Sequence, residues 1–131
     1  MAQGFKTILA WQKSDELVAK IYKVTQEFSP KSELFGLTSQ IRRAAISVAA
    51  NIAEGSARQS LREYIHFLYV AKGSLAEVEY YIHLANKLGY LPTEAHLSLY
   101  DLQQEVGRIL QGFIEFKQRQ LEREEQSIKR T

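Results

Sequence analysis

The sequence predicts an all-α protein, a single domain folded as an antiparallel up-down-up-down four-helix bundle. Three observations lead to this fold class. Apolar residues recur at steps of three and four residues in four segments, which is the spacing of one face of a helix. The breaks between these segments are short, as between antiparallel neighbours. The chain of 131 residues contains only two prolines, and a proline inside a helix costs about 3 kcal/mol.

The first helix is expected over residues 8–28, because the residue before Pro30 is disfavoured in the helical conformation. The second helix is expected over residues 35–55, with Gly55 as a candidate C-terminal cap. The apolar positions that define their inner faces are Trp11, Leu17 or Val18, Ile21, Val24 and Phe28 in the first, and Leu37, Ile41, Ala45, Val48 and Ile52 in the second.

The third helix is expected over residues 61–88. Ser60 precedes it and a glutamate follows three residues later, which is the spacing of a capping box, and Gly89 is a candidate C-terminal cap. The fourth helix is expected over residues 94–120, where apolar residues alternate steps of three and four as in a bundle seam. The charged residues 121–131 are expected to fray.

The composition excludes several classes of site. No cysteine is present, so disulfide bonds, thiolate metal ligands and thiol nucleophiles are excluded. The N-terminal residues lack the apolar core of a signal peptide, and no stretch approaches the roughly 20 apolar residues that span a bilayer. We therefore expect a cytoplasmic protein that does not enter a membrane.

The motifs of catalysis are also missing. The sequence has no glycine-flanked serine elbow and no glycine-rich phosphate loop after a strand. Di-metal four-helix bundles use two Glu-x-x-His pairs, whereas this sequence has one, from Glu63 to His66. Glu63 also fits the capping box. We expect no metal, no cofactor and no small-molecule substrate, and we expect that the protein is not an enzyme.

The second helix carries a line of polar residues beside its apolar face. Alanines flank this line and would let another helix approach closely, in which case the polar groups need partners across the contact. Two interpretations stay open: a buried polar seam, within the bundle or between subunits, and a solvated helix face. The residues of the line are Gln40, Arg43, Ser47, Asn51 and Glu54.

The middle of the third helix carries small residues at Gly73 and Ser74, followed by Glu77. A glycine inside a helix costs about 1 kcal/mol relative to alanine, so Gly73 indicates a packing role. We expect this patch to receive the second helix, and Glu77 to meet an arginine such as Arg43.

Basic residues gather in the middle of the chain. Between residues 40 and 72 there are five cations and two carboxylates, an excess of +3, while the whole chain carries +2. Exposed cations bind phosphates without a fixed motif, although a solvated charged face has the same composition. An oligomer would repeat each small patch and strengthen its summed field. The candidate nucleic-acid-binding residues are Arg42, Arg58, Arg62, Lys72 and Arg108.

Several blocks of the sequence resemble a known family, the four-helix-bundle proteins encoded in intervening sequences of bacterial 23S ribosomal RNA genes. The resemblance covers nearly the whole chain to about residue 116, and Ser14 stands where the family usually has alanine. The blocks are residues 33–37 (ELFGL), 40–45 (QIRRAA), 51–55 (NIAEG), 71–77 (AKGSLAE) and 88–91 (LGYL).

The resemblance implies a homo-pentamer with residues of the second and third helices in the subunit contacts. At lower similarity, the same fold is shared by accessory proteins of diversity-generating retroelements, which are basic pentameric barrels that bind nucleic acid and a reverse transcriptase. We therefore expect a non-catalytic homo-oligomer that binds structured RNA, or an RNA/DNA complex, through a composite basic surface. The alternative is a protein-interaction scaffold that docks a reverse transcriptase.

Overall fold

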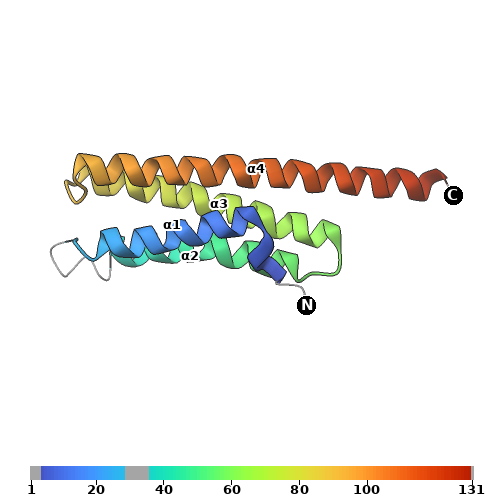
Figure 1. The fold of residues 1–131 in the computed structure, drawn as a ribbon, viewed down its shortest axis with the longest axis horizontal. Helices are drawn as coiled ribbons and strands as arrows, with labels where there is room; N and C mark the ends of the chain where they lie inside the picture. Colours follow the sequence, from blue (N-terminus) through green and yellow to red (C-terminus); the bar gives the residue numbers. More distant parts are fainter. Residues whose placement is uncertain (1–3, 29–35, 131) are drawn as a thin grey trace.

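The computed structural model describes residues 4–28 and 36–130. A short 3-10 helix, η1 (Gly4–Thr7), precedes four α-helices that run alternately up and down (Figure 1). In the bundle, α2 packs on α1 and α3, and α4 packs on α3 and α1. The predicted all-α antiparallel bundle is confirmed. The helices are α1 (Leu9–Thr25), α2 (Leu37–Ser56), α3 (Leu61–Lys87) and α4 (Thr93–Arg130).

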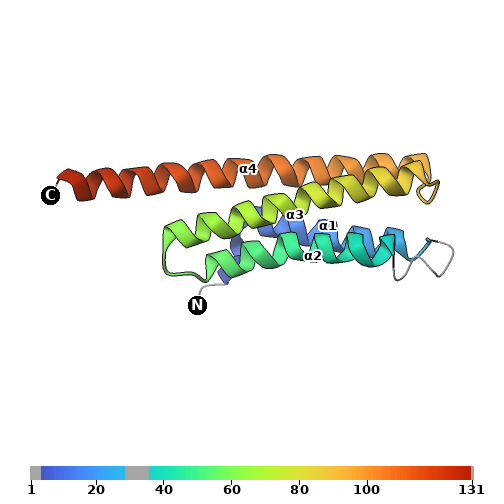
Figure 2. The same ribbon diagram turned by 180° about the vertical axis from the view of Figure 1, so that it is seen from behind.

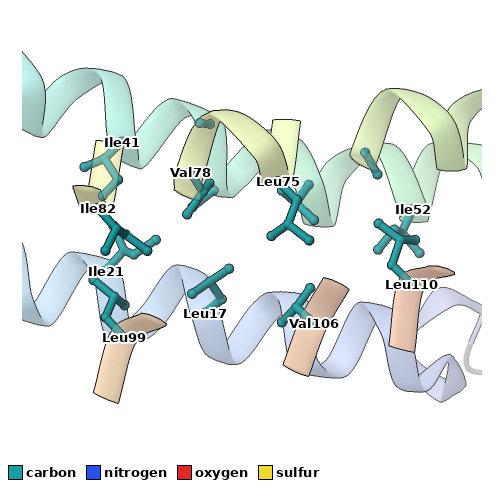
Figure 3. Packing of buried hydrophobic residues seen from close by; sticks show 14 of the residues in the cluster. Leu17, Ile21, Ile41, Ile52, Leu75, Val78, Ile82, Leu99, Val106 and Leu110 are labelled. Carbon is teal, nitrogen blue, oxygen red and sulfur yellow. The ribbon is translucent and has the colours of Figure 1, made fainter. Parts of the chain in front are cut away.

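The core lies along the bundle axis and draws apolar side chains from all four helices (Figure 3). The helical spacing seen in the sequence places these side chains on the inner face of each helix, so their burial stabilises all four together. The largest fully buried side chains are Leu17, Ile21, Ile41, Val48, Ile52, Leu68, Val78, Ile82, Leu99, Val106, Leu110 and Ile114.

Both predicted ends of α3, at Ser60 and at Gly89, are confirmed by hydrogen bonds. The Ser60 hydroxyl accepts a hydrogen bond from the backbone N–H of Glu63 at 3.0 Å, which caps the N-terminus. At the other end Gly89 has a positive φ of 79°. The backbone N–H of Tyr90 donates to the Ala85 carbonyl at 2.9 Å, completing a Schellman motif.

Gly55 does not cap α2, so that prediction is wrong. The helix continues through Ser56, and Gly55 is buried where α2 approaches α3. A Cβ atom added at Gly55 would lie 2.9 Å from the Cβ of Phe67 and 3.2 Å from the carbonyl oxygen of Tyr64. Glycine is therefore required here by the close approach of two backbones, because no side chain fits between them.

α4 is longer than predicted. Residues 121–130, expected to fray, continue the helix to Arg130 and extend past the other helices (Figures 1 and 2), while Thr131 lies outside the described residues. Lateral contacts and composition explain the difference. The Gln118 amide donates to the Tyr69 hydroxyl at 2.6 Å, and Arg62 of α3 pairs with Glu125. Residues 121–126 (LEREEQ) are also strong helix formers.

The remaining boundaries differ by a few residues. α1 ends at Thr25 instead of residue 28, and the hydroxyl of Thr25 donates to the Ile21 carbonyl at 2.7 Å. The predicted start of the second helix at residue 35 lies outside the described residues, and the first described helical residue there is Leu37.

Candidate functional site

Arg42, the first of the predicted phosphate-binding residues, is engaged within the bundle. Its Nε donates to the Thr25 hydroxyl at 2.9 Å, and its guanidinium carbon lies 4.4 Å from the centre of the Tyr22 ring. The side chain is half-buried and joins α2 to α1. Since a guanidinium held in this way is not a freely exposed cation, Arg42 contributes mainly to the α1–α2 contact.

Arg58 lies in the turn between α2 and α3, and Arg62 lies in the first turn of α3, at one end of the bundle. Arg58 Nη2 is 3.1 Å from the Glu54 carboxylate, and the guanidinium lies 4.8 Å from the centre of the Phe67 ring. Arg62 forms an ion pair with Glu125 of α4. Both arginines remain exposed at the surface, where such ion pairs are worth about 0–1 kcal/mol, so a phosphate can replace either carboxylate.

Lys72 and Arg108 line an open groove of about 650 Å³ between α3 and α4. Glu79 and Glu115 line the same groove, so its two cations are balanced by two carboxylates. Leucine side chains of both helices form part of the lining. The groove is therefore not a basic surface, although within the described residues Arg108 forms no ion pair.

A single chain keeps the predicted cations apart. Arg42 lies on α2 and Arg58 lies just after its end, and the 14 residues from Arg42 to Ser56 alone correspond to about 21 Å along the helix at 1.5 Å per residue. Arg62 and Lys72 are ten residues apart on α3, or about 15 Å. The structure thus places the five residues in three locations: the α1–α2 contact, the α2–α3 turn and the α3–α4 groove.

The polar line of α2 divides into an inner and an outer part. The hydroxyls of Ser47 and Ser74 lie 2.7 Å apart across the α2–α3 contact, and the Asn51 amide donates to the carbonyl and hydroxyl of Ser47 at 2.8 and 3.0 Å. We call these three residues the polar seam. The other members of the line, Gln40, Arg43 and Glu54, are exposed on the outer side of α2. Both sequence interpretations therefore apply, each to part of the line.

Gly73 and Glu77 do not make the predicted contacts within the chain. Gly73 is exposed, and a Cβ added to it would have no neighbour within 4 Å. Glu77 is also exposed, and among the described residues it forms no ion pair with Arg43. The expectation that the patch receives the second helix holds for Ser74, whose hydroxyl meets Ser47 of α2, and fails for Gly73, because adjacent residues on a helix are turned about 100° from each other.

Sequence reasoning missed an aromatic cluster around Lys117. The Nζ atom of Lys117 lies 5.0 Å from the ring centre of Tyr64, 5.5 Å from that of Phe113 and 5.8 Å from that of Phe116. Burial raises the pKa of Tyr64 to about 12. These residues line a cavity of about 550 Å³ together with the start of α1. Phe113 and Phe116 have the three-residue spacing of a bundle seam, which predicts burial, whereas 49% of Phe116 is exposed.

Metal-ligating and membrane-spanning features are not found in the part of the chain that the structure describes. Within residues 4–28 and 36–130, no three histidine or carboxylate side chains are grouped in a way that could hold a metal ion. In those same ranges no helix is long and apolar enough to cross a bilayer.

The fold and the surface together define a class: an antiparallel four-helix bundle with a polar seam between two helices and charged residues on its outer faces. The chain belongs to the 23S rRNA-intervening sequence protein family, whose model matches residues 6–112. The resemblance identified in the sequence is thereby confirmed at the level of the family. No curated protein shows significant similarity to the chain.

A solved relative has the same fold. It is a protein of unknown function from the S23 ribosomal protein family of Bacteroides thetaiotaomicron, with 26% sequence identity and a TM-score of 0.75. The similarity covers 98% of that protein and 81% of this chain. About a fifth of this chain thus lies outside the shared fold, and the family model ends before the last turns of α4.

Proposed function

We propose that this protein is a non-catalytic, cytoplasmic homo-oligomer, a pentamer, that binds structured RNA through a basic surface to which several subunits contribute. The observation that carries this proposal is the separation of the candidate cations into three locations on one chain. Family membership favours RNA as the nucleic acid, and the number of subunits comes from the family resemblance. Repetition around a ring would bring equivalent arginines of neighbouring subunits onto one face.

Self-association is supported by the outer surface of α2 and α3. A mid-helix glycine such as Gly73 costs about 1 kcal/mol relative to alanine, although no atom of the described residues lies within 4 Å of a Cβ added there. Exposed apolar residues lie on the same two helices, with 44% of Ile46, 39% of Val70 and 57% of Tyr80 exposed. An interface that pairs this surface with a different one on the next subunit is heterologous, and such an interface forms a ring when the rotation from each subunit to the next closes on itself.

Replacing Gly73 with leucine is expected to dissociate the assembly without unfolding the chain. The added side chain would fill space that is open in one chain and, by this proposal, is occupied by the neighbouring subunit. Sedimentation velocity would show the loss of the oligomer, and circular dichroism would show an intact helix content. Asn86→Leu, at an exposed position near the end of α3, is the matched control and should leave the mass unchanged. An oligomer that tolerates Gly73→Leu would argue against this interface.

Neutralising Arg58 and Arg62 together is expected to weaken RNA binding. Each lost phosphate contact reduces the slope of log K against log salt by roughly 0.7–0.9, so the double variant R58Q/R62Q should flatten the slope by about 1–2 per subunit. The matched control is K23Q/K87Q, which removes two exposed cations at the opposite end of the bundle (Figure 1). Equal salt slopes for the wild type and R58Q/R62Q would exclude these arginines from the RNA contact.

A second candidate function is that of a protein-interaction scaffold, for example an accessory subunit that docks a reverse transcriptase. The observation in its favour is the α3–α4 groove, where balanced charges and a partly apolar lining suit a protein segment better than a phosphate backbone. A pull-down that retains a protein partner after nuclease treatment would favour this function over RNA binding.

A further inference from the structure

The last part of α4 has a fixed orientation on the bundle. We call residues 113–130 the α4 extension, since they follow the segment that the family model matches. Ile114 is fully buried, and the ring of Phe113 packs edge-on against Tyr64 with 5.9 Å between ring centres. Farther along, Gln118 donates to Tyr69, and Glu125 pairs with Arg62. These contacts fix which side of the extension faces α3 and which side faces solvent.

Three arginines lie on the solvent side. With 3.6 residues per turn, Arg119, Arg123 and Arg130 fall within a narrow sector roughly opposite Ile114, and all three are exposed. Steps of four and seven residues separate them by about 6 and 10.5 Å along the helix. We call Arg119, Arg123 and Arg130 the arginine stripe. Phe116, which is 49% exposed, lies at the bundle end of the same sector.

Helix geometry keeps carboxylates away from Arg123 and Arg130, since neither has a glutamate three or four residues away. The extension holds five cations and four glutamates, a net charge of only +1, so its composition alone does not indicate an anion-binding surface. Glu125 nevertheless faces the bundle and Glu124 lies on the far flank of the helix, whereas Glu115 and Glu122, four and three residues from Arg119, border the stripe at that end. Separation by helix face therefore creates a basic surface from a nearly neutral segment.

The arginine stripe is also free of internal ion pairs. Among the described residues, neither Arg119, Arg123 nor Arg130 pairs with a carboxylate, whereas Arg58 and Arg62 each do. An anion can therefore bind the stripe without displacing a glutamate. Arginine also presents a planar fork that matches two phosphate oxygens.

We propose that the arginine stripe is a binding surface for the phosphate backbone of structured RNA, separate from the Arg58–Arg62 site and presented on a helix that projects beyond the bundle (Figure 2). This inference rests on the proposed RNA-binding function. The stripe suits a nucleic acid better than an anionic membrane. The apolar side of the extension is packed on the bundle at Phe113 and Ile114. Farther along that side Ile128 is 72% exposed, but a single isoleucine does not form a broad apolar face that could insert into lipid.

The test compares the variants R119Q/R123Q and K23Q/K87Q in the full-length protein. Glutamine keeps the helix propensity of arginine, so the fold is preserved and only charge is lost. For an RNA hairpin with a fully paired stem, R119Q/R123Q should bind at least about tenfold more weakly, with a salt slope flatter by about 1–2 per subunit, while K23Q/K87Q should match the wild type. A similar loss of affinity for a DNA hairpin of the same sequence would support contacts with the phosphate backbone.

The outcomes separate this inference from the function on which it rests. Wild-type protein that binds the hairpin with an affinity unaffected by R119Q/R123Q would overturn the arginine stripe and leave RNA binding in place. Wild-type protein that does not bind the hairpin would overturn both. A third outcome is that the wild type binds phosphatidylserine vesicles but not the hairpin, and that R119Q/R123Q no longer binds the vesicles. This outcome would assign the stripe to a membrane and contradict the proposal.

Discussion

Substituting alanine for Ile41 is expected to lower the free energy of unfolding by about 2–5 kcal/mol. Ile41 is fully buried on α2 and belongs to the core cluster that also contains Ile82 of α3 and Ile21 of α1 (Figure 3). Its loss would leave a cavity between three helices, which cannot all move inward to fill it. Urea unfolding at a fixed protein concentration, followed by circular dichroism, measures the change.

The control is the same substitution at an exposed isoleucine. Ile128, in the α4 extension, is 72% exposed, and Ile128→Ala should change the free energy of unfolding by no more than about 0.5 kcal/mol. Similar losses for the two variants would contradict the placement of Ile41 in a packed core.

Substituting alanine for Gly55 is expected to lower the free energy of unfolding by about 1–3 kcal/mol, although alanine favours helix more strongly than glycine. The new methyl group would lie 3.2 Å from the Tyr64 carbonyl oxygen, a backbone atom that cannot rotate away, and 2.9 Å from the Cβ of Phe67. α2 and α3 would have to separate near their connecting turn, which weakens the packing of both helices.

Gly112→Ala is the matched control for this substitution. Gly112 lies in the middle of α4, and an added Cβ has no neighbour within 4 Å. The helix preference of alanine should therefore raise stability by up to about 1 kcal/mol, the opposite sign from Gly55→Ala. A stabilised Gly55→Ala variant would show that α2 and α3 do not approach each other as closely as described.

The helices could be predicted because helical periodicity is a local property of the sequence. The inner faces of α1 to α4 follow from steps of three and four residues, and the ends of α3 follow from Ser60 and Gly89. The role of Gly55 could not be predicted in the same way. A glycine near a helix end suggests a cap, and only the approach of Tyr64 and Phe67 from the next helix shows that it is a packing residue.

The sequence predicts a fourth helix that ends at residue 120, ten residues before α4 ends, for a related reason. Residues 121–130 contain few apolar side chains, so periodicity gives no reason to extend the helix. The contacts that hold the extension join residues far apart in the sequence, such as Arg62 with Glu125 and Tyr69 with Gln118. Sequence spacing does not reveal such pairs.

The candidate site was predicted in part. Ser47 and Asn51 were expected to need polar partners, and they hydrogen-bond within the polar seam with Ser74. The surroundings of each cation could not be predicted, since they depend on three-dimensional neighbours: Arg42 is held against Tyr22, while Arg123 is exposed and has no ion pair with any residue that the structure describes. Residue type alone therefore does not distinguish a structural arginine from one that is available to a ligand.

The claim that this protein works as an assembly is tested most directly by the mass of the purified chain in solution. Sedimentation equilibrium over a range of concentrations should give five times the chain mass of 15.0 kDa, or about 75 kDa. A mass of 15.0 kDa at every concentration would contradict the proposal, because the separate cations of one chain would then have no neighbouring subunit to complete a common surface.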